Sequence, residues 1–273
     1  WLKFGRLHEH ARRIGATHVA SGHYARIDRG HPDGPRLLRG VDHGKDQSYV
    51  LFGAPRERLD RMLLPIGGYR KAEIRAMAED RGLPVFDKPD SQEICFVPDD
   101  DYARLVAARS ESGVAPGRLV DLEGHAVGEH GGHQRFTIGQ RRRIGVALGY
   151  PLYVVDKDAD TNTVTVGPRA ALAATACAAA EANWLVDPPA TWRRCTARIR
   201  SNAEPVPARV RATGDGTLAV RFDAPQDAVA PGQAVVCYEE DRVLGGGWIR
   251  SATRAGASSS PSSSSAAAEA SES

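Results

Sequence analysis

The sequence predicts an α/β unit followed by a β-rich region, and the change of pattern along the chain carries this prediction. Up to about residue 108, apolar residues at three- and four-residue spacing alternate with short apolar runs, as in helices that alternate with buried strands. From residue 117 to residue 248 the apolar runs are short, alternating or β-branched, and turn-forming residues separate them. Their spacing after residue 182 indicates a small barrel or a sandwich.

The first helix is predicted at the start of the chain. Residues 2–14 carry an apolar stripe with helical spacing, and Gly15 follows as a terminator. Residues 16–20 have the composition of a short buried strand.

Two further helices are expected in the α/β unit. Residues 71–81 predict a helix that ends at Gly82, and another begins after Pro98 with Asp99 as its N-cap. The residues expected on the inward face of the first of these two helices are Ile74, Met77 and Ala78.

Short strands and turns are predicted for the rest of the chain up to residue 248. The predicted runs are 117–127, 151–155, 163–166, 197–200, 208–212, 218–222 and 234–238. Beyond Arg250 the chain is almost only Ser, Ala and Glu, which cannot bury enough apolar surface to become ordered.

Composition excludes several classes of protein. With 273 residues and 41% hydrophobic content, the chain is long enough for more than one core. It has no run of eighteen apolar residues and no secretory signal, so we expect a soluble cytoplasmic protein. The first residue is Trp rather than Met, and we expect the chain to begin inside a longer protein.

The cysteines and charges narrow the chemistry further. The four cysteines lie far apart, without a C-x-x-C pair or a histidine at ligand spacing, which argues against a structural zinc site and a disulfide framework. The net charge is only +2, but the arginines are clustered, and clustering matters more to a polyanionic partner.

Ser21-Gly22-His23-Tyr24 is the first candidate functional motif. It follows the predicted strand, and ligands of α/β sheets bind beyond the carboxyl ends of strands, where glycine lets a nucleotide approach the backbone. The alternative is an ordinary strand-to-loop turn, which is the more frequent meaning of so short a motif.

Gly44-Lys45-Asp46-Gln47-Ser48-Tyr49 is the second candidate. Lysine can meet a phosphate, and Asp and Gln can hydrogen-bond to a base edge or anchor a loop. A helix start capped by Asp46 is an equally good interpretation.

Cys95, in the segment from Asp90 to Pro98, is the third candidate. The helix expected after Pro98 would place its N-terminus near the thiol, which lowers the pKa of a cysteine and favours the reactive thiolate. Most isolated cysteines are inert core residues, and the flanking acids oppose a thiolate.

Arginines form the fourth candidate, in two stretches. Residues 133–146 hold four arginines among glycines and one aromatic residue, which suits phosphate contacts, although solvated surface arginines are the alternative. The second stretch favours a shared polyanionic partner because Glu204 is its one acid. Its arginines are Arg193, Arg194, Arg198, Arg200, Arg209 and Arg211.

Taken in order, these segments resemble the tRNA-specific 2-thiouridylase (MnmA/TrmU) family. The resemblance rests on K-F-G, A-S-G-H-Y-A-R, G-V-D-H-G-K-D-Q-S-Y-V-L-F, L-P-I-G-G-Y-R-K-A-E-I-R, K-P-D-S-Q-E-I-C-F-V, F-T-I-G-Q-R-R-R-I-G-V, Y-V-V-D-K-D and P-G-Q-A-V-V-C-Y. It extends from Lys3 to Trp248. Each piece is weak, but the ordered set is specific.

The resemblance implies an ATP-dependent sulfur transfer to tRNA. In such enzymes ATP, as its magnesium complex, adenylates the C2 oxygen of the wobble uracil and makes it a leaving group. A cysteine persulfide, charged by a sulfur-relay donor protein, then delivers sulfur to C2.

The resemblance also implies roles for individual residues. Cys95 matches the persulfide-bearing cysteine, and Gly22 matches a backbone contact to ATP. Ser201 stands where an aromatic residue is expected in the family. The positions that match tRNA contacts are His23, Lys45, Asp46, Gln47, Arg200, Ser201 and Gln233.

The implied architecture begins with the remainder of a pyrophosphate-loop ATPase domain, adenine nucleotide hydrolase-like, over residues 1–107. A small mixed or β central tRNA-binding domain (108–170), a C-terminal β-barrel (171–252) and a disordered tail (253–273) follow. The family's ATP-binding loop and its N-P-D-x-x-C segment with the other catalytic cysteine are expected upstream of Trp1, so the chain alone is expected not to adenylate tRNA. The alternatives are another pyrophosphate-loop ATPase and a non-catalytic tRNA-binding remnant.

Overall fold

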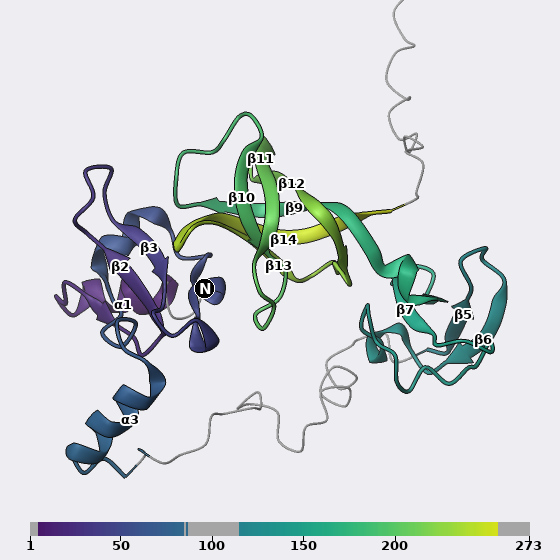
Figure 1. The fold of residues 1–273 in the computed structure, drawn as a ribbon, viewed down its shortest axis with the longest axis horizontal. Coiled ribbons are helices and arrows are strands. Elements are labelled where there is room, and N and C mark those ends of the chain that lie inside the picture. The colour runs from purple at the N-terminus through teal and green to yellow at the C-terminus, as the bar shows by residue number, and fades with distance from the viewer. Residues whose placement is uncertain (1–4, 85, 87–114, 256–273) are drawn as a thin grey trace, which may run out of the picture.

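A computed structural model of the chain describes residues 5–84, 86 and 115–255. Figure 1 shows three parts, and the part that comes last in the chain lies between the other two. The first part contains short strands among helices. Its elements are α1 (Leu7–Arg13), β1 (Val19–Ala20), β2 (Ala25–Asp28), β3 (Arg36–Arg39), η2 (His43–Lys45), α2 (Ser48–Leu51), η3 (Arg56–Arg61), β4 (Met62–Leu63) and α3 (Lys71–Asp80). Strand β1 pairs in parallel with β4, and β2 forms an antiparallel hairpin with β3. The predicted α/β character is confirmed.

Glycines end two of the helices, as the sequence predicts. Gly15 after α1 and Gly82 after α3 have φ of +75° and +63°, the left-handed conformation that glycine adopts without a steric penalty. After α3 the N–H of Leu83 donates to the carbonyl of Ala78 at 2.9 Å, a closing bond typical of a glycine C-terminus.

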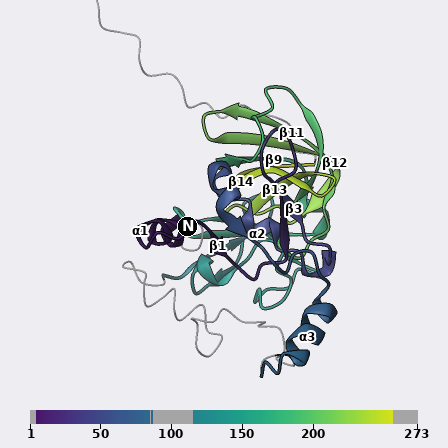
Figure 2. The ribbon, with the colours of Figure 1, turned by 90° about the vertical axis from the view of Figure 1, so that its left-hand side faces the viewer.

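Helix α3 projects away from the rest of the first part (Figures 1 and 2). None of its residues is buried, and Ile74, Met77 and Ala78 are half-buried. The predicted face is the less exposed one, but among the described residues it is not part of a core. The helix predicted after Pro98 lies outside the described residues, as does Cys95.

The central part is a four-stranded mixed sheet. Its strands β5 (Gly117–Val120), β6 (Ala126–His130), β7 (Tyr153–Asp158) and β8 (Thr163–Gly167) have the order β6-β5-β8-β7, with β5 and β8 parallel. Leu119, Val154 and Val164 are fully buried between this sheet and the loop that contains Phe136 and Ile144. The alternating apolar pattern of the sequence therefore marks real strands.

The last part is a closed six-stranded barrel. Of the two folds that the sequence leaves open, a barrel and a sandwich, the barrel is therefore correct. Its strands are β9 (Ala173–Trp184), β10 (Arg193–Arg198), β11 (Val206–Gly214), β12 (Thr217–Asp227), β13 (Ala234–Glu239) and β14 (Arg242–Arg254). They follow the order β13-β10-β11-β12-β9-β14, and pairing of β13 with β14 closes the ring. Inward residues such as Val210, Leu218 and Val220 fill the interior.

The two longest barrel strands, β9 and β14, escaped the sequence prediction. Strand β9 is rich in alanine, and β14 contains Gly245, Gly246 and Gly247, both compositions depleted in strands. The glycines fit because a Cβ at position 246 would lie 2.5 Å from the carbonyl oxygen of Val235. Strand β14 also runs to Arg254, so the predicted tail at 253–273 begins too early.

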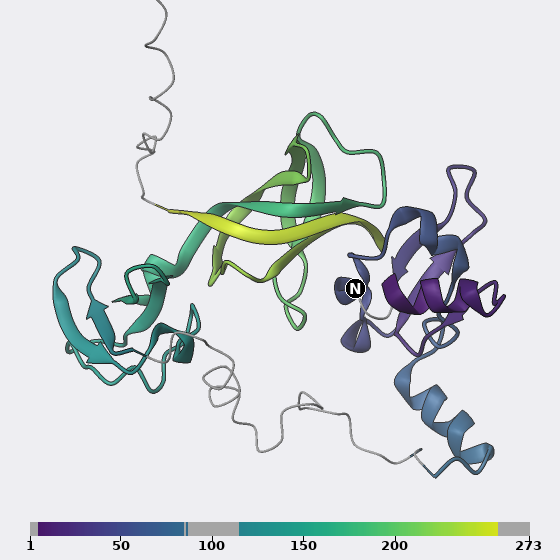
Figure 3. The ribbon, with the colours of Figure 1, turned by 180° about the vertical axis from the view of Figure 1, so that it is seen from behind.

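The first part and the barrel share a core. Leu38 of β3 pairs with Arg242 of β14, so the hairpin extends the barrel's sheet. Leu51, Leu59 and Met62 pack in one buried cluster with barrel residues that include Val236 and Tyr238. Figures 1 and 3 show the β5–β8 sheet at the opposite end of the barrel from the first part. No helix in the described ranges combines the length and apolar character needed to span a membrane.

Candidate functional site

The two polar motifs of the first part lie side by side. The backbone N–H of Gln47 donates to the carbonyl of Tyr24 at 2.9 Å, and the N–H of Tyr24 donates to Oε1 of Gln47 at 3.0 Å. This pair of hydrogen bonds ties the Lys45-Asp46-Gln47 segment to the end of Ser21-Gly22-His23-Tyr24. Two segments that the sequence suggests separately therefore form one surface.

Gly22 and His23 follow strand β1 after one intervening residue, Ser21. Gly22 is exposed, and a Cβ at this position would meet only Ile66, at 3.9 Å, so the space beside the backbone is open. His23 is half-buried, and its Nδ1 lies 2.6 Å from Oγ of Ser21. Ser21 is held in turn by its N–H, which donates to the carbonyl of Leu63 at 2.9 Å. The exposed backbone at the carboxyl end of a parallel strand is where nucleotides approach α/β sheets.

Asp46 is the buried centre of the second motif. Oδ1 accepts hydrogen bonds from the backbone N–H groups of Gly40 (3.1 Å) and Ser48 (3.0 Å). Oδ2 accepts from the Ser48 hydroxyl at 2.9 Å and from Nη1 of Arg198 at 2.8 Å. The carboxylate is fully buried, whereas Lys45 and Gln47 on either side are exposed. The Asp46 side chain thus anchors the segment, and its neighbours face solvent.

Arg198 extends this anchor into the barrel. Its side chain is 8% exposed, and Nη2 donates to the backbone carbonyl of Ser201. The sequence groups Arg198 with arginines available to a polyanion, and this is wrong because its guanidinium is buried between Asp46 and Ser201. A chain of contacts therefore runs from the Lys45-Asp46-Gln47 segment to the loop that carries Arg200 and Ser201.

A cavity of about 1000 Å³ lies between the first part and the barrel. The first part contributes residues from Tyr49 to Pro55 and Arg58, and the barrel contributes Trp248 and three loop or strand segments. The lining residues named by the sequence as tRNA contacts are Arg200, Ser201 and Gln233. Three predicted residues from two separate segments of the barrel therefore line one site.

The polar groups of this cavity are positioned by the barrel loops. Nη2 of Arg200 donates to the carbonyl of Asp227 at 3.0 Å. The Gln233 N–H donates to the carbonyl of Ala230 at 3.3 Å, and its carbonyl accepts from Ile249 at 2.8 Å. The buried Oε1 of Gln233 has no hydrogen-bond partner within the described residues. The cavity is therefore lined by the Arg200 guanidinium and by Gln233, whose amide oxygen is buried.

Tyr49 forms the polar base of the cavity. Its hydroxyl donates to the carbonyl of Ala234 at 2.8 Å, and burial raises its pKa to about 12. The Arg198 guanidinium lies 5.8 Å from the centre of the Tyr49 ring. Tyr49 stays protonated at neutral pH and serves to join the two parts, a role that no local sequence signal indicates.

Three of the four cysteines lie in the barrel. Cys177 and Cys237 are buried and Cys195 is half-buried. Burial raises the pKa of the Cys177 thiol to about 12. A hydrogen bond with Cys195, and then burial, raise the pKa of Cys237 well above its ordinary value. Neither thiol favours the reactive thiolate.

The arginines of residues 133–146 are exposed, as required for a phosphate contact. Arg135, Arg141, Arg142 and Arg143 all face solvent. The loop is fixed by Gln140, whose Nε2 donates to the carbonyl of Arg142 at 2.8 Å. Whether a polyanion binds here stays a prediction.

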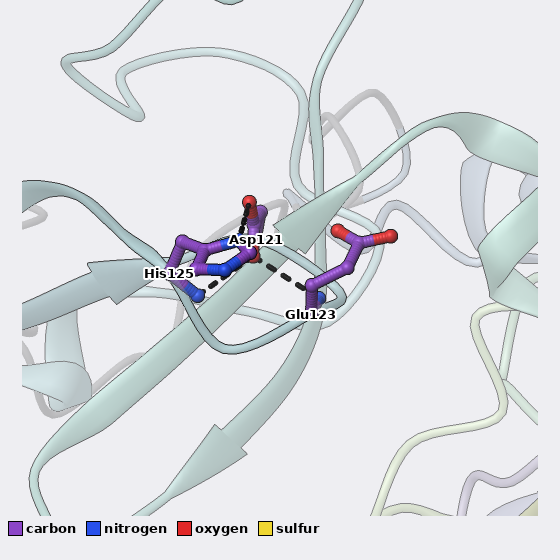
Figure 4. A group of neighbouring side chains, drawn as sticks. All are labelled: Asp121, Glu123 and His125. Atoms are coloured by element: carbon purple, nitrogen blue, oxygen red, sulfur yellow. Dashed lines mark hydrogen bonds and ion pairs between the residues drawn. The ribbon is translucent and has the colours of Figure 1, made fainter.

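Asp121, Glu123 and His125 gather at the turn between β5 and β6 (Figure 4). Oδ1 of Asp121 accepts from the backbone N–H groups of Glu123 (3.0 Å) and His125 (2.8 Å), and Oδ2 lies 3.2 Å from Nδ1 of His125. These contacts are those of a turn closed by its own aspartate. They explain the grouping without a metal ion.

Family models match all three parts of the chain. Residues 1–99 match the tRNA methyl transferase HUP domain, residues 109–168 match the tRNA methyl transferase PRC-barrel domain, and residues 174–249 match the aminomethyltransferase beta-barrel domain. This combination defines a class of tRNA-modifying protein with a nucleotide-binding type of first domain.

Curated relatives identify the family within this class. The chain is 47% identical over 249 residues to the tRNA-specific 2-thiouridylase MnmA of Chloroflexus aurantiacus strain J-10-fl, covering 91% of the chain and 69% of that protein. It is 44% identical to the protein of the same name from Geotalea uraniireducens, over 92% of the chain and 67% of that protein. The corresponding protein of Geobacter metallireducens is 45% identical, over 93% and 69%. The chain belongs to the tRNA-specific 2-thiouridylase family.

Proposed function

We propose that this chain acts in the 2-thiolation of the wobble uridine of tRNA, with Cys95 as the residue that carries persulfide sulfur to C2 of the base. The observation that carries the proposal is the chain of contacts from Asp46 through Arg198 to Ser201. It joins the Lys45-Asp46-Gln47 segment to the cavity. A tRNA contacts many protein residues at once. A binding site built from the first part and the barrel therefore suits a tRNA better than it suits a small metabolite.

The exposed and half-buried polar residues of this site are the proposed tRNA contacts. Lys45 and Arg200 suit phosphate oxygens, and Gln47 and Gln233 suit base edges or sugar hydroxyls. His23 lies beside the Gln47 segment and Ser201 at the cavity. Asp46 contributes by holding Lys45 and Gln47 in place, since its own carboxylate is buried.

The barrel thiols support Cys95 as the sulfur carrier. A persulfide forms when a thiolate attacks the sulfane sulfur of a donor, so a buried thiol with a raised pKa is a poor acceptor. Cys177 and Cys237 are of this kind. Cys95 is in the S-Q-E-I-C-F motif and lies outside the described residues.

The proposed contact of the first part with ATP is Gly22. The open, exposed backbone after β1 suits a nucleotide contact, and Gly22 is the residue that we propose for it. ATP, when bound, would supply the activation that turns the C2 oxygen of uracil into a leaving group. The residues of this chain would bind the tRNA, orient the base and present the sulfur.

Sulfur would pass from the donor to the base in three bond exchanges. The Cys95 thiolate attacks the terminal sulfur of a donor persulfide, the donor S–S bond breaks, and the donor leaves as a thiolate. The terminal sulfur on Cys95 then forms a bond to C2 as the activated oxygen departs. Attack of a second thiol on the Cys95 sulfur breaks the remaining S–S bond, leaving a disulfide and the 2-thiouridine.

A persulfide assay tests this proposal without requiring turnover. The full chain would be incubated with a cysteine desulfurase and cysteine, and persulfides trapped by alkylation would be located by peptide mass spectrometry. The persulfide is expected on Cys95 and lost in Cys95→Ser, while Cys195→Ser retains it. A persulfide on Cys195 instead, or tRNA binding with no persulfide on Cys95, would contradict the assignment, and the latter would favour a non-catalytic tRNA-binding role.

A further inference from the structure

The outer face of the barrel carries a second group of arginines, away from the cavity. Arg194 of β10, Arg209 of β11 and Arg221 of β12 are Cα partners in one row across three neighbouring strands. Arg211 lies two residues further along β11 on the same outward face. All four are exposed, and none lines the cavity described above. We call these four residues the arginine row.

The arginine row differs in its contacts from the other arginines between residues 193 and 211. Arg193 pairs with Glu239 at 2.7 Å, and Arg198 is buried against Asp46. Arg200 donates to a backbone carbonyl at the cavity. In the described parts of the chain, no member of the arginine row has an acidic partner within ion-pair distance, although Asp223 lies on the same face of β12.

Trp192 orients two members of the row. The guanidinium carbons of Arg211 and Arg221 lie 4.8 Å and 4.5 Å from the centre of its ring. Trp192 lies in a loop held to β11 by the N–H of Ala212, which donates to the carbonyl of Pro189 at 2.8 Å. Cation–π contacts hold flexible arginine side chains in place, which lowers the entropy lost when they bind a partner.

This arrangement is unfavourable for the isolated protein. Like charges directly opposite each other on neighbouring strands destabilise a sheet. Three such charges in register, with no acid between them, form a positive patch that a negative partner would stabilise. The guanidinium fork fits phosphate oxygens, and the Trp192 ring is already engaged by two arginines, so the face suits a phosphate backbone better than an unstacked base.

We propose that the arginine row is a second tRNA-binding surface that contacts the phosphate backbone without reading sequence. This proposal rests on the proposed function, because it takes tRNA as the partner, and it adds a contact surface outside the cavity. Arg194 and Arg198 are four residues apart on β10, roughly 13 Å at the usual rise of a strand. Arg198 does not itself line the cavity, but it donates to the backbone carbonyl of Ser201, which does. One RNA can therefore reach the row and the cavity at the same time.

Salt dependence of binding tests the proposal on the full chain. The affinity of a wobble-uridine tRNA transcript would be measured from 50 to 300 mM KCl for the wild type, Arg209→Gln/Arg221→Gln and a charge-matched control. Arg12→Gln/Arg13→Gln is the control, because both residues are exposed on α1. Each lost phosphate contact lowers the slope of log K against log salt by about 1. The row variant is expected to lose about 2 in slope, equally for tRNAs of different anticodon, and the control to lose none.

The results of these binding measurements distinguish a failure of the arginine-row proposal from a failure of the proposed function. If the wild type binds tRNA with a steep salt dependence and the row variant matches the control, the arginine row is not an RNA contact. If the row variant keeps its tRNA affinity but loses binding of the sulfur donor, the surface serves an acidic protein and the proposal is overturned. If the wild type shows no salt-dependent tRNA binding, the proposed function fails. Thermal unfolding excludes a folding defect, because removal of facing charges should leave the melting temperature unchanged or higher.

Discussion

Asp46 and Arg198, 152 positions apart in the sequence, form a buried ion pair with 2.8 Å between Oδ2 and Nη1. The carboxylate also accepts from two backbone N–H groups and the Ser48 hydroxyl. This pair fixes the position of the barrel relative to the Lys45-Asp46-Gln47 segment. The geometry of the candidate tRNA site therefore depends on it.

Loss of one partner of this pair is expected to be costly. Asp46→Asn leaves the Arg198 guanidinium buried without its counter-charge, which typically lowers the free energy of unfolding by about 3–5 kcal/mol. The matched control is Asp187→Asn, which breaks the exposed pair with Arg56 and should cost at most about 1 kcal/mol. Urea unfolding measures both, and similar losses in the two variants would show that the buried pair has no special role.

Gly67 should tolerate no side chain. A Cβ at this position would lie 1.7 Å from the carbonyl oxygen of Ala25, a backbone atom that cannot rotate away, whereas a Cβ at Gly68 meets nothing within 4 Å. We expect Gly67→Ala to lower the free energy of unfolding by about 3 kcal/mol, as in an overpacked core. Gly68→Ala should stay within about 0.5 kcal/mol of the wild type. Thermal unfolding of the two variants tests this prediction. Equal melting temperatures would contradict the close approach of Gly67 to the backbone of Ala25.

His8 should make the stability depend on pH. Burial, and then the charges of Arg58 and Arg61, lower the pKa of this histidine below 6.5. Near this pKa the folded state therefore binds fewer protons than the unfolded state. The contribution of His8 to the free energy of unfolding is complete above pH 6.5 and declines as the pH falls towards the pKa of the folded state. His8→Gln should flatten the pH dependence of the unfolding free energy between about pH 7 and pH 5. The control variant is His10→Gln, which replaces a histidine at an exposed position of the same helix. Identical pH profiles for the wild type and His8→Gln would rule out this contribution.

The cysteines should react with alkylating reagents in a set order. Cys177 and Cys237 are buried and have raised pKa values. In native protein at pH 8, the reagent should therefore modify these two thiols last. We expect Cys95 to react first if it is the sulfur carrier. Peptide mapping of a time course with iodoacetamide gives the order, and denatured protein, in which all four thiols react, is the control. Early modification of Cys177 would be incompatible with the closed barrel.

The sequence indicated the candidate segments, whose roles stay predictions, but it did not indicate how they are connected. Residues 21–24 and 44–49 and the barrel residues Arg200 and Gln233 could be found from local motifs and the family resemblance. The Arg198 contact to Asp46 could not, because its two ends lie far apart and an arginine that pairs inside the protein looks the same in sequence as one that faces solvent. Cys95 lies outside the described residues, and its role stays a proposal.

The sequence by itself determined the α/β start, the helix ends at Gly15 and Gly82, and most of the β-strands of the second half. These features depend on backbone conformation and on the alternation of neighbouring side chains, which are local properties. Only the tertiary structure decided that β9 and β14 are strands, that the barrel closes, and that Arg221 joins Arg194 and Arg209 in one row. Such features depend on strand pairing between distant segments, and a strand composed of alanine and glycine is stabilised by its neighbours rather than by its own propensity.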